Sequence, residues 1–190
     1  MKMKIIIISA ILLAFSSAVN AQDNLSKQRK AAIDSLALEK VRDLSKYISI
    51  IGSKETPFSE ANRVIERTLE LFAEGAQMGV SSLYKDGVKN YPVRKYLERL
   101  MALNYDKINI TWYNIQYISD LELQPDGKYV GVITIYQRFE GTTDEGLVYM
   151  DTTKKDITVY VEKKQAQISG RLIDFWDVLL GDIRVAETER

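Results

Sequence analysis

Tyr136, Arg138 and Glu140 occupy alternate positions in a stretch where apolar and polar residues alternate. On an extended strand such residues share one face and lie roughly 6.5–7 Å apart. An arginine beside a tyrosine could bind a carboxylate ligand, because the guanidinium presents a fork of donors to two oxygens. We therefore predict Tyr136 and Arg138 as ligand-binding residues. The alternative is a cross-strand ion pair in which the arginine stem only packs.

Three acids, Asp174, Asp177 and Asp182, lie close together near the carboxyl terminus, beside Trp176. Asp177 is the one we expect to face inward, because its neighbours at alternate positions are apolar. A carboxyl group that faces an apolar cavity has a raised pKa and can act as a base. Asp177 is therefore predicted as a third ligand-binding residue, and Trp112 as a fourth. The alternative for Asp177 is a solvent-facing or hydrogen-bonded carboxylate.

Missing residue types exclude several chemistries. The chain has neither histidine nor cysteine, so it can form no Ser-His-Asp triad, no thiol nucleophile and no zinc site of the usual nitrogen and sulfur ligands. It also lacks a G-x-G-x-x-G or other phosphate-binding loop. We predict no cofactor, no metal and no assigned catalytic residue.

The amino terminus is typical of a cleavable signal peptide over residues 1–21. Lys2 and Lys4 precede an apolar run over residues 5–15, and Val19 and Ala21 stand where a signal peptidase requires small residues. The run is shorter than the roughly 20 residues that cross a bilayer, although an uncleaved anchor is the alternative. We predict export to the periplasm or the exterior, with no membrane contact after cleavage.

Charge gives no indication of a polyanionic partner. The chain has 26 basic and 26 acidic residues, and loss of Lys2 and Lys4 with the signal leaves 24 against 26, a net charge of about −2. Nucleic acid binding normally requires a clustered basic surface. We therefore predict no nucleic acid partner.

The mature chain divides into a helical first half and a strand-rich second half, which favours an α+β domain. We expect an amino-terminal helix within residues 22–52 and an α+β domain over 53–190. Apolar residues at helical spacing predict helices over 24–50, from Thr56-Pro57 onward, and after Tyr91-Pro92. The buried positions expected for the first two helices are Ile33, Leu36, Val41, Leu44, Tyr47, Ile48, Phe58, Ala61, Val64, Ile65, Leu69 and Phe72.

Strands are predicted by alternation with period two. They cover residues 76–83 (brief), 107–117, 128–139, 147–162 and 174–185, with polar residues 151–156 interrupting the fourth. A change of phase after Trp112 indicates a β-bulge. Turns are expected at Lys85-Asp86-Gly87 and Gln124-Pro125-Asp126-Gly127, and a polar connection over residues 140–146. Several strands are apolar on both faces, so a second copy of the chain is expected to cover one face as a homodimer.

This pattern resembles the nuclear transport factor 2-like superfamily of cone-shaped α+β domains, which includes SnoaL-like proteins. The resemblance lies in residues 69–76, residues 93–103, and the strands that hold residues 108–113 and 176–183. It implies three helices packed on a curved antiparallel sheet of four or more strands, a cavity at the open end of the cone, and frequent dimerisation. It implies no single function, because related folds serve unrelated ones.

The sequence leaves three functions open. The first is an exported non-catalytic domain that binds a small molecule or a protein partner. The second is an isomerase or dehydratase type of enzyme, which would require a tyrosine hydroxyl and a carboxylate that face one enclosed pocket. The third is a structural component of an envelope assembly, which would show a large exposed apolar patch instead of a pocket.

Overall fold

The computed structural model describes residues 25–117 and 119–189. The predicted signal peptide over residues 1–21 lies outside this part of the chain. The elements follow one another as α1 (Lys27–Gly52), α2 (Phe58–Leu69), β1 (Gln77–Ser82), β2 (Lys85–Pro92), α3 (Val93–Met101), β3 (Lys107–Tyr117), β4 (Glu122–Leu123), β5 (Tyr129–Thr143), β6 (Gly146–Ile168) and β7 (Arg171–Glu189).

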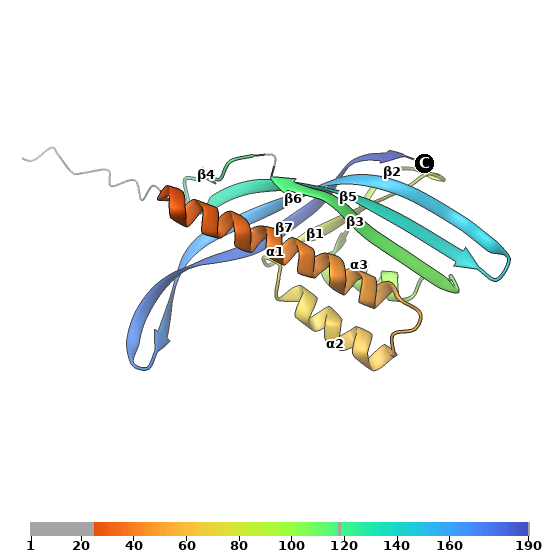
Figure 1. Ribbon diagram of the computed structural model, residues 1–190, viewed down its shortest axis with the longest axis horizontal. Coiled ribbons are helices and arrows are strands. Elements are labelled where there is room, and N and C mark those ends of the chain that lie inside the picture. Colours follow the sequence, from red (N-terminus) through yellow and green to blue (C-terminus); the bar gives the residue numbers. More distant parts are fainter. Residues whose placement is uncertain (1–24, 118, 190) are drawn as a thin grey trace, which may run out of the picture.

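The strands form one curved sheet with the order β2-β1-β7-β6-β5-β3, and the short β4 pairs with β5. The helices lie together against one face of this sheet (Figure 1). The predicted α+β architecture is therefore confirmed. The sheet is mixed rather than wholly antiparallel, because β1 pairs with β7 in parallel through Met78 and Ile183.

Helix α1 begins at the cap residue Ser26, whose side chain accepts a hydrogen bond from the Arg29 backbone N–H at 3.2 Å. Its buried stripe is almost the predicted one and comprises Ile33, Ala37, Val41, Leu44, Ile48 and Ile51. Leu36 was wrongly placed in this stripe: it is 37% exposed, and the small Ala37 takes the inward position. Within residues 25–117 and 119–189, no helix is both long enough and apolar enough to cross a membrane.

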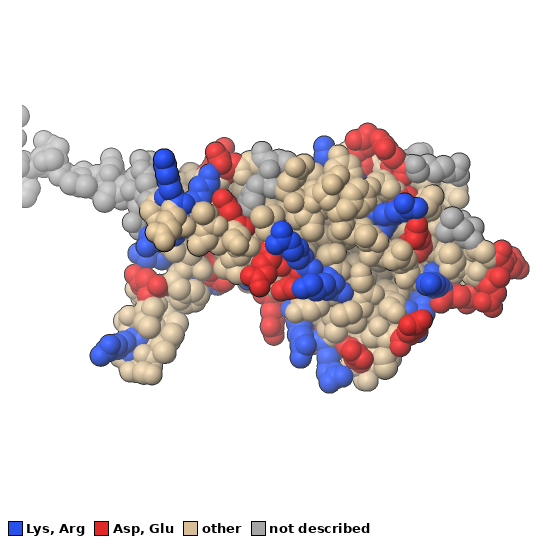
Figure 2. Space-filling model, viewed as in Figure 1, with Lys and Arg blue, Asp and Glu red and all other residues tan. Residues whose placement is uncertain are grey.

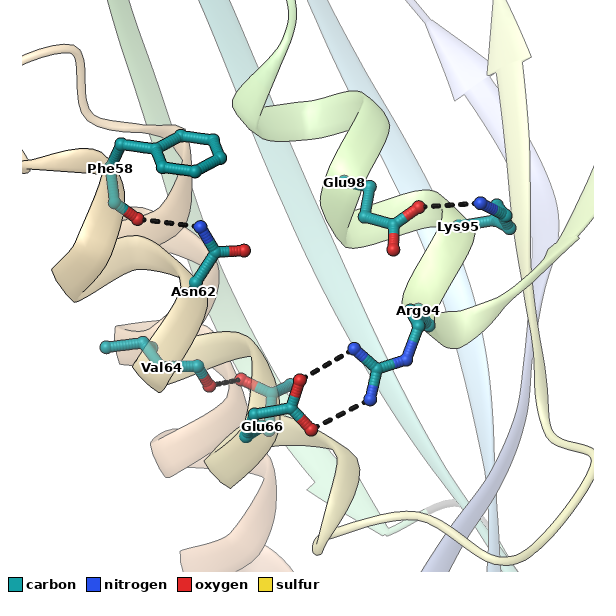
Figure 3. Close-up of polar contacts among 8 residues, drawn as sticks. Phe58, Asn62, Val64, Glu66, Arg94, Lys95 and Glu98 are labelled. Atoms are coloured by element: carbon teal, nitrogen blue, oxygen red, sulfur yellow. Dashed lines mark hydrogen bonds and ion pairs between the residues drawn. The ribbon is translucent and has the colours of Figure 1, made fainter.

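Helices α2 and α3 each follow a proline, as predicted, with Pro57 and Pro92 as the cap residues. A forked ion pair joins the two helices: the Arg94 guanidinium donates to both Glu66 carboxylate oxygens at 2.7 and 2.8 Å (Figure 3). This hydrogen bonding holds the pKa of Glu66 below its usual value. Phe58 was predicted to be buried but is 71% exposed, because it stands on the first, outward-facing turn of α2.

The strands are longer and more continuous than the sequence suggested. The predicted bulge in β3 is confirmed: its register against β5 shifts between Tyr113 and Gln116, and Asn114 between them has a φ of 51°. The predicted turn at Gln124 is also confirmed, with a hydrogen bond from the Gly127 N–H to the Gln124 carbonyl.

Three predictions about the strands were wrong. The strand β2 was missed, and the β1–β2 turn lies at residues 83–84 rather than 85–87. The polar connection over 140–146 shrinks to residues 144–145, because both strands extend into it. The polar stretch 151–156 does not interrupt β6, since it pairs with β5 on one side and with β7 on the other.

The β6–β7 hairpin continues beyond the body of the domain as a two-stranded arm (Figure 1). Register places Ile168, Ile173 and Phe175 on one face of this arm, where they are 55%, 44% and 42% exposed. Acidic and basic side chains are scattered over the body in Figure 2, whereas much of the arm is uncharged. The arm therefore leaves apolar side chains in solvent.

Gly141 supplies a test of the packing. A Cβ atom at this position would lie 2.7–2.8 Å from three ring carbons of Tyr105, whereas one at Gly52 would make ordinary contacts of 3.4–3.6 Å. We expect Gly141→Ala to lower the free energy of unfolding by about 1–3 kcal/mol, because the ring must move in packed surroundings. Gly52→Ala is the control and should change it little. Urea unfolding measures both, and equal effects of the two variants would contradict this account.

Candidate functional site

A cavity of about 320 Å³ lies at one end of the domain, between the inner face of the sheet and α3. Its volume is at the lower end of the roughly 300–1,000 Å³ that small-molecule sites occupy. The lining residues come from β1, β2, α3, β5, β6 and the segment after α3. They are Val80, Ser81, Ser82, Tyr84, Tyr91, Tyr96, Arg99, Leu100, Leu103, Tyr105, Gln137, Phe139, Tyr149, Asp151, Thr153 and Lys155.

Aromatic rings form one wall of this cavity. Tyr84 packs edge-on against Tyr149, Tyr149 against Phe139, and Phe139 against Tyr105, with ring centroids 5.4–5.9 Å apart. Such edge-to-face pairs are favourable arrangements for aromatic rings. The wall is thus a connected aromatic surface suited to a flat or apolar ligand.

A phenol and a carboxyl group meet within the cavity. The Tyr149 hydroxyl donates a hydrogen bond to Asp151 Oδ2 and accepts one from the Leu83 backbone N–H at 3.2 Å. Burial raises the pKa of Asp151, and the Tyr149 hydrogen bond and the charge of Lys155 only partly offset this. Burial and the bond to Asp151 also raise the pKa of the Tyr149 phenol. The pair is therefore biased toward its protonated forms.

Lys155 lies deepest of the charged residues that line the cavity, with 2% of its surface exposed. Its Nζ donates to the Gly79 carbonyl oxygen at 3.3 Å and lies 5.8 Å from the centre of the Tyr96 ring. Burial lowers the pKa of Lys155 to about 8, against the weaker opposing effect of the Asp151 charge. At pH 7 this amine is still mostly protonated, but it loses its proton about two pH units earlier than an exposed lysine does.

Two further polar groups complete the lining. The Arg99 guanidinium on α3 lies over the Tyr91 ring, 4.7 Å from its centre, a typical cation–π arrangement. Gln137 on β5 accepts a hydrogen bond from the Trp112 indole N–H at 3.2 Å. Trp112 is buried on β3, directly beside Gln137 in the register of the sheet, and contacts the cavity lining through this bond.

The structure does not bring the four predicted ligand-binding residues together. Tyr136 lies on the outer sheet face and stacks on Tyr113, with ring centroids 5.7 Å apart. Arg138 is half-exposed and forms an ion pair with Glu140 at 2.9 Å. Asp177 accepts a hydrogen bond from Lys164 at 2.7 Å. Of the four, only Trp112 is connected to the cavity: it does not line it, but it donates a hydrogen bond to the lining residue Gln137.

The other two acids of the predicted set are also engaged elsewhere. Asp174 accepts a hydrogen bond from Gln165 at 2.8 Å, and Asp182 accepts one from the Gln77 backbone N–H at 3.0 Å. Neither lines the cavity.

The cavity residues of β6 were missed, although the sequence held a signal for them. Ile157 and Val159 point inward, and the same alternation carried back along the strand places Lys155, Thr153 and Asp151 inward as well. Polarity had suggested a break in the strand instead. Gln137 follows Ile133 and Ile135 inward on β5 in the same manner.

A second hollow lies on the outer sheet face and includes Tyr160, Leu179 and several charged side chains. Its charges are largely neutralised by one another: Glu162 pairs with Lys128 at 3.4 Å and with Lys164 at 2.9 Å. Among the described residues, no cluster of three or more acids could hold a metal ion. The inner cavity, with its buried amine, is therefore the better candidate site.

The buried amine gives a pH-dependent prediction. Lys155 titrates near 8 in the folded chain but near 10.4 when unfolded, so its protonated form destabilises the fold below about pH 8. This cost disappears as pH rises from about 8 to about 10.4. We expect Lys155→Met to be more stable than the wild type by about 3 kcal/mol at pH 7, with the difference closing toward pH 10.

Urea unfolding between pH 6 and pH 10 tests this expectation. Lys154→Met is the matched control, because Lys154 is the preceding residue of β6 and lies on the opposite face. A stability difference for Lys155→Met that stays constant with pH would contradict the prediction.

Comparison with known proteins adds fold-level likeness only. No protein-family model and no curated protein match this chain. It is similar in structure to a candidate scytalone dehydratase from Novosphingobium aromaticivorans, with 11% identity and a TM-score of 0.44 over 85% of this chain and 90% of that one.

Two other solved structures are similar to the same degree. A protein from Kribbella flavida has 11% identity and a TM-score of 0.45, over 84% of this chain and 95% of that one. A hexachlorocyclohexane dehydrochlorinase (LinA type 2) has 13% identity and a TM-score of 0.40, over 83% and 91%. At these values the likeness supports no statement about activity.

Proposed function

We propose that this protein binds a small molecule in the cavity at the end of its sheet. The observation that carries the proposal is a concave site with aromatic walls and a few convergent polar groups, which is the usual composition of small-molecule sites. Tyr149 and Phe139 supply apolar contact area, while Lys155 and Arg99 supply hydrogen-bond donors. The best-fitting ligand is a compact, largely apolar or aromatic molecule that bears a carbonyl or acidic oxygen.

Charge supports the preference for an electron-rich group. The charged residues that line the cavity are Lys155, Arg99 and Asp151, and the pKa of Asp151 is raised by burial. Donors therefore predominate over ionised acceptors. A ligand oxygen directed at Lys155 would gain a stronger hydrogen bond than it makes in water, because the local dielectric is low.

Acid–base catalysis on such a ligand is the second candidate function. The observation that favours it is the Tyr149–Asp151 hydrogen bond inside the cavity, since the two groups could donate and accept a proton at one bound molecule. The test is deuterium exchange at the carbon next to the carbonyl of cyclohexanone, followed by NMR in D₂O. Catalysed exchange that disappears in both Asp151→Asn and Tyr149→Phe would support this function, and no exchange above the uncatalysed rate would argue against it.

The setting and assembly form part of the same proposal. We place this binding outside the cytoplasm, on the basis of the basic and apolar segments of residues 1–21. A homodimer that covers the outer sheet face remains compatible with the half-buried Tyr136 and Tyr160 on that face. Light scattering of residues 22–190 tests the dimer, and a monomer mass at micromolar concentration would reject it.

A cavity-filling variant tests the binding proposal. Anilinonaphthalene sulfonate, an aromatic anion, is expected to bind the cavity and to alter the fluorescence of Trp112, which contacts the lining residue Gln137. Thr153→Phe should weaken this binding at least tenfold, because Thr153 is a cavity residue with 2% exposure. Thr152→Phe, on the opposite face of β6, is the control and should bind as the wild type does.

The measurement is a fluorescence titration in a Trp176→Phe background, which leaves Trp112 as the reporter. Thermal melting of each variant shows whether it is folded. Equal affinity of the two phenylalanine variants would place the dye elsewhere and reject the cavity as its site.

A further inference from the structure

We propose that Lys155 is a nucleophilic amine that captures a carbonyl compound, an aldehyde or an unhindered ketone, as an imine inside the cavity. This inference rests on the proposed small-molecule binding and assigns the chemical class of the ligand. Its basis is the position of the amine, the absence of an ion-pair partner among the residues that the structure describes, and the composition of the walls around it.

The position of Lys155 is that of a core residue. It lies on the inner face of β6 between Thr153 and Ile157, which are 2% and 0% exposed. Among the described lysines it is the one that is almost completely buried, and it also lines the cavity. A ligand that enters the cavity therefore meets this amine, and bulk water does not compete for it as it does at a surface lysine.

The amine lacks the partner that buried lysines ordinarily require. Its hydrogen bond is to the Gly79 carbonyl at 3.3 Å, and no acid of the described chain lies within ion-pair distance of its Nζ. Lys164 on the same strand differs: it contacts Asp177 at 2.7 Å and Glu162 at 2.9 Å. One long hydrogen bond and the face of the Tyr96 ring compensate a buried ammonium less well than an ion pair would. Lys155 therefore gives up its proton, and exposes its free electron pair, more readily than a surface lysine does.

The groups that face Lys155 from neighbouring elements support the same protonation state. The Tyr96 ring from α3 faces the amine directly. Arg99 from α3 and Tyr91 from β2 line the same cavity, and Asp151 lies two pleats away on β6 itself. Burial lowers the pKa of Lys155 to about 8 and raises the pKa of Asp151. Lysines in apolar pockets become reactive toward carbonyl carbons for this reason.

The reaction is balanced without any further reagent. The neutral Lys155 nitrogen attacks the carbonyl carbon, and one amine proton passes to the oxygen to give a carbinolamine. Loss of that hydroxyl with the second amine proton releases one water molecule and leaves a carbon–nitrogen double bond. The reverse reaction with water restores the amine and the carbonyl compound, so capture is reversible. The aromatic wall of Tyr149 and Phe139 favours an aryl or alkyl substituent on the carbonyl carbon.

Reductive trapping tests the proposal. The full mature chain is incubated at pH 8 with benzaldehyde and sodium cyanoborohydride, which converts an imine into a stable benzylamine. Mass spectrometry with peptide mapping then locates the adduct. We expect one predominant adduct at Lys155, formed at least tenfold faster than at any other lysine. Lys154→Met should retain this adduct, and Lys155→Met should lose it while melting as a folded protein.

A second measurement separates this inference from the proposed function. Benzaldehyde without reductant should displace anilinonaphthalene sulfonate from the wild type, and Thr153→Phe should slow labelling of Lys155. Displacement without preferential labelling of Lys155 would overturn the imine proposal and leave small-molecule binding intact. Failure of the dye itself to bind the cavity would overturn the proposed function. Should Lys155→Met not fold, two measurements with Lys155 intact replace it: slower labelling of Lys155 in Thr153→Phe, and protection of Lys155 by the dye in the wild type. Labelling of Lys155 that neither change slows would overturn the proposal.

Discussion

The alternation of side chains along β6 is the constraint on which the cavity depends. This strand pairs with β5 and β7 over most of its 23 residues, so its register cannot slip. Successive side chains must point to opposite faces. Burial of Ile157 and Val159 in the core therefore also commits Lys155, Thr153 and Asp151 to the inner face. The apolar part of the strand determines where its polar part points.

Inward residues of the sheet become part of the core where the helices cover them and line the cavity where they do not. Helix α1 buries its stripe against the sheet, and α2 and α3 pack beside it with the Glu66–Arg94 pair between them. Toward the β5–β6 turn the sheet continues past this cover, and α3 and the segment that follows it line the inner surface there. Beyond the aliphatic core between helices and sheet, aromatic rings and polar side chains line the remaining space. A cavity at the end of the sheet follows from strands that are longer than the helices that cover them.

Much of the fold could be predicted from the sequence because helix and strand periods are local signals. The stripe of α1, the proline starts of α2 and α3, and the bulge near Asn114 all followed from spacing. The site was harder to predict. A run of polar residues inside a strand looks like a loop if polarity alone is considered and the alternation of side chains between the two faces is not followed. Tyr136 and Arg138 formed a plausible local motif, but a strand has two faces, and pairing with β3 and β6 placed these residues on the outer one.

The energetic cost of Lys155 supports a role for the amine beyond packing. A methionine would fill the same space without a buried charge, and the protonated amine costs about 3 kcal/mol at neutral pH in a fold whose total stability is on the order of 5–15 kcal/mol. The compensation in the structure is one long hydrogen bond to Gly79, the face of the Tyr96 ring and the weaker effect of the Asp151 charge. The pKa of Asp151 shifts in the opposite direction, so the proton equilibria of both groups are displaced toward their neutral forms. A ligand oxygen directed at Lys155 meets a donor that need not first break an ion pair with another described residue, so the amine is available to the ligand.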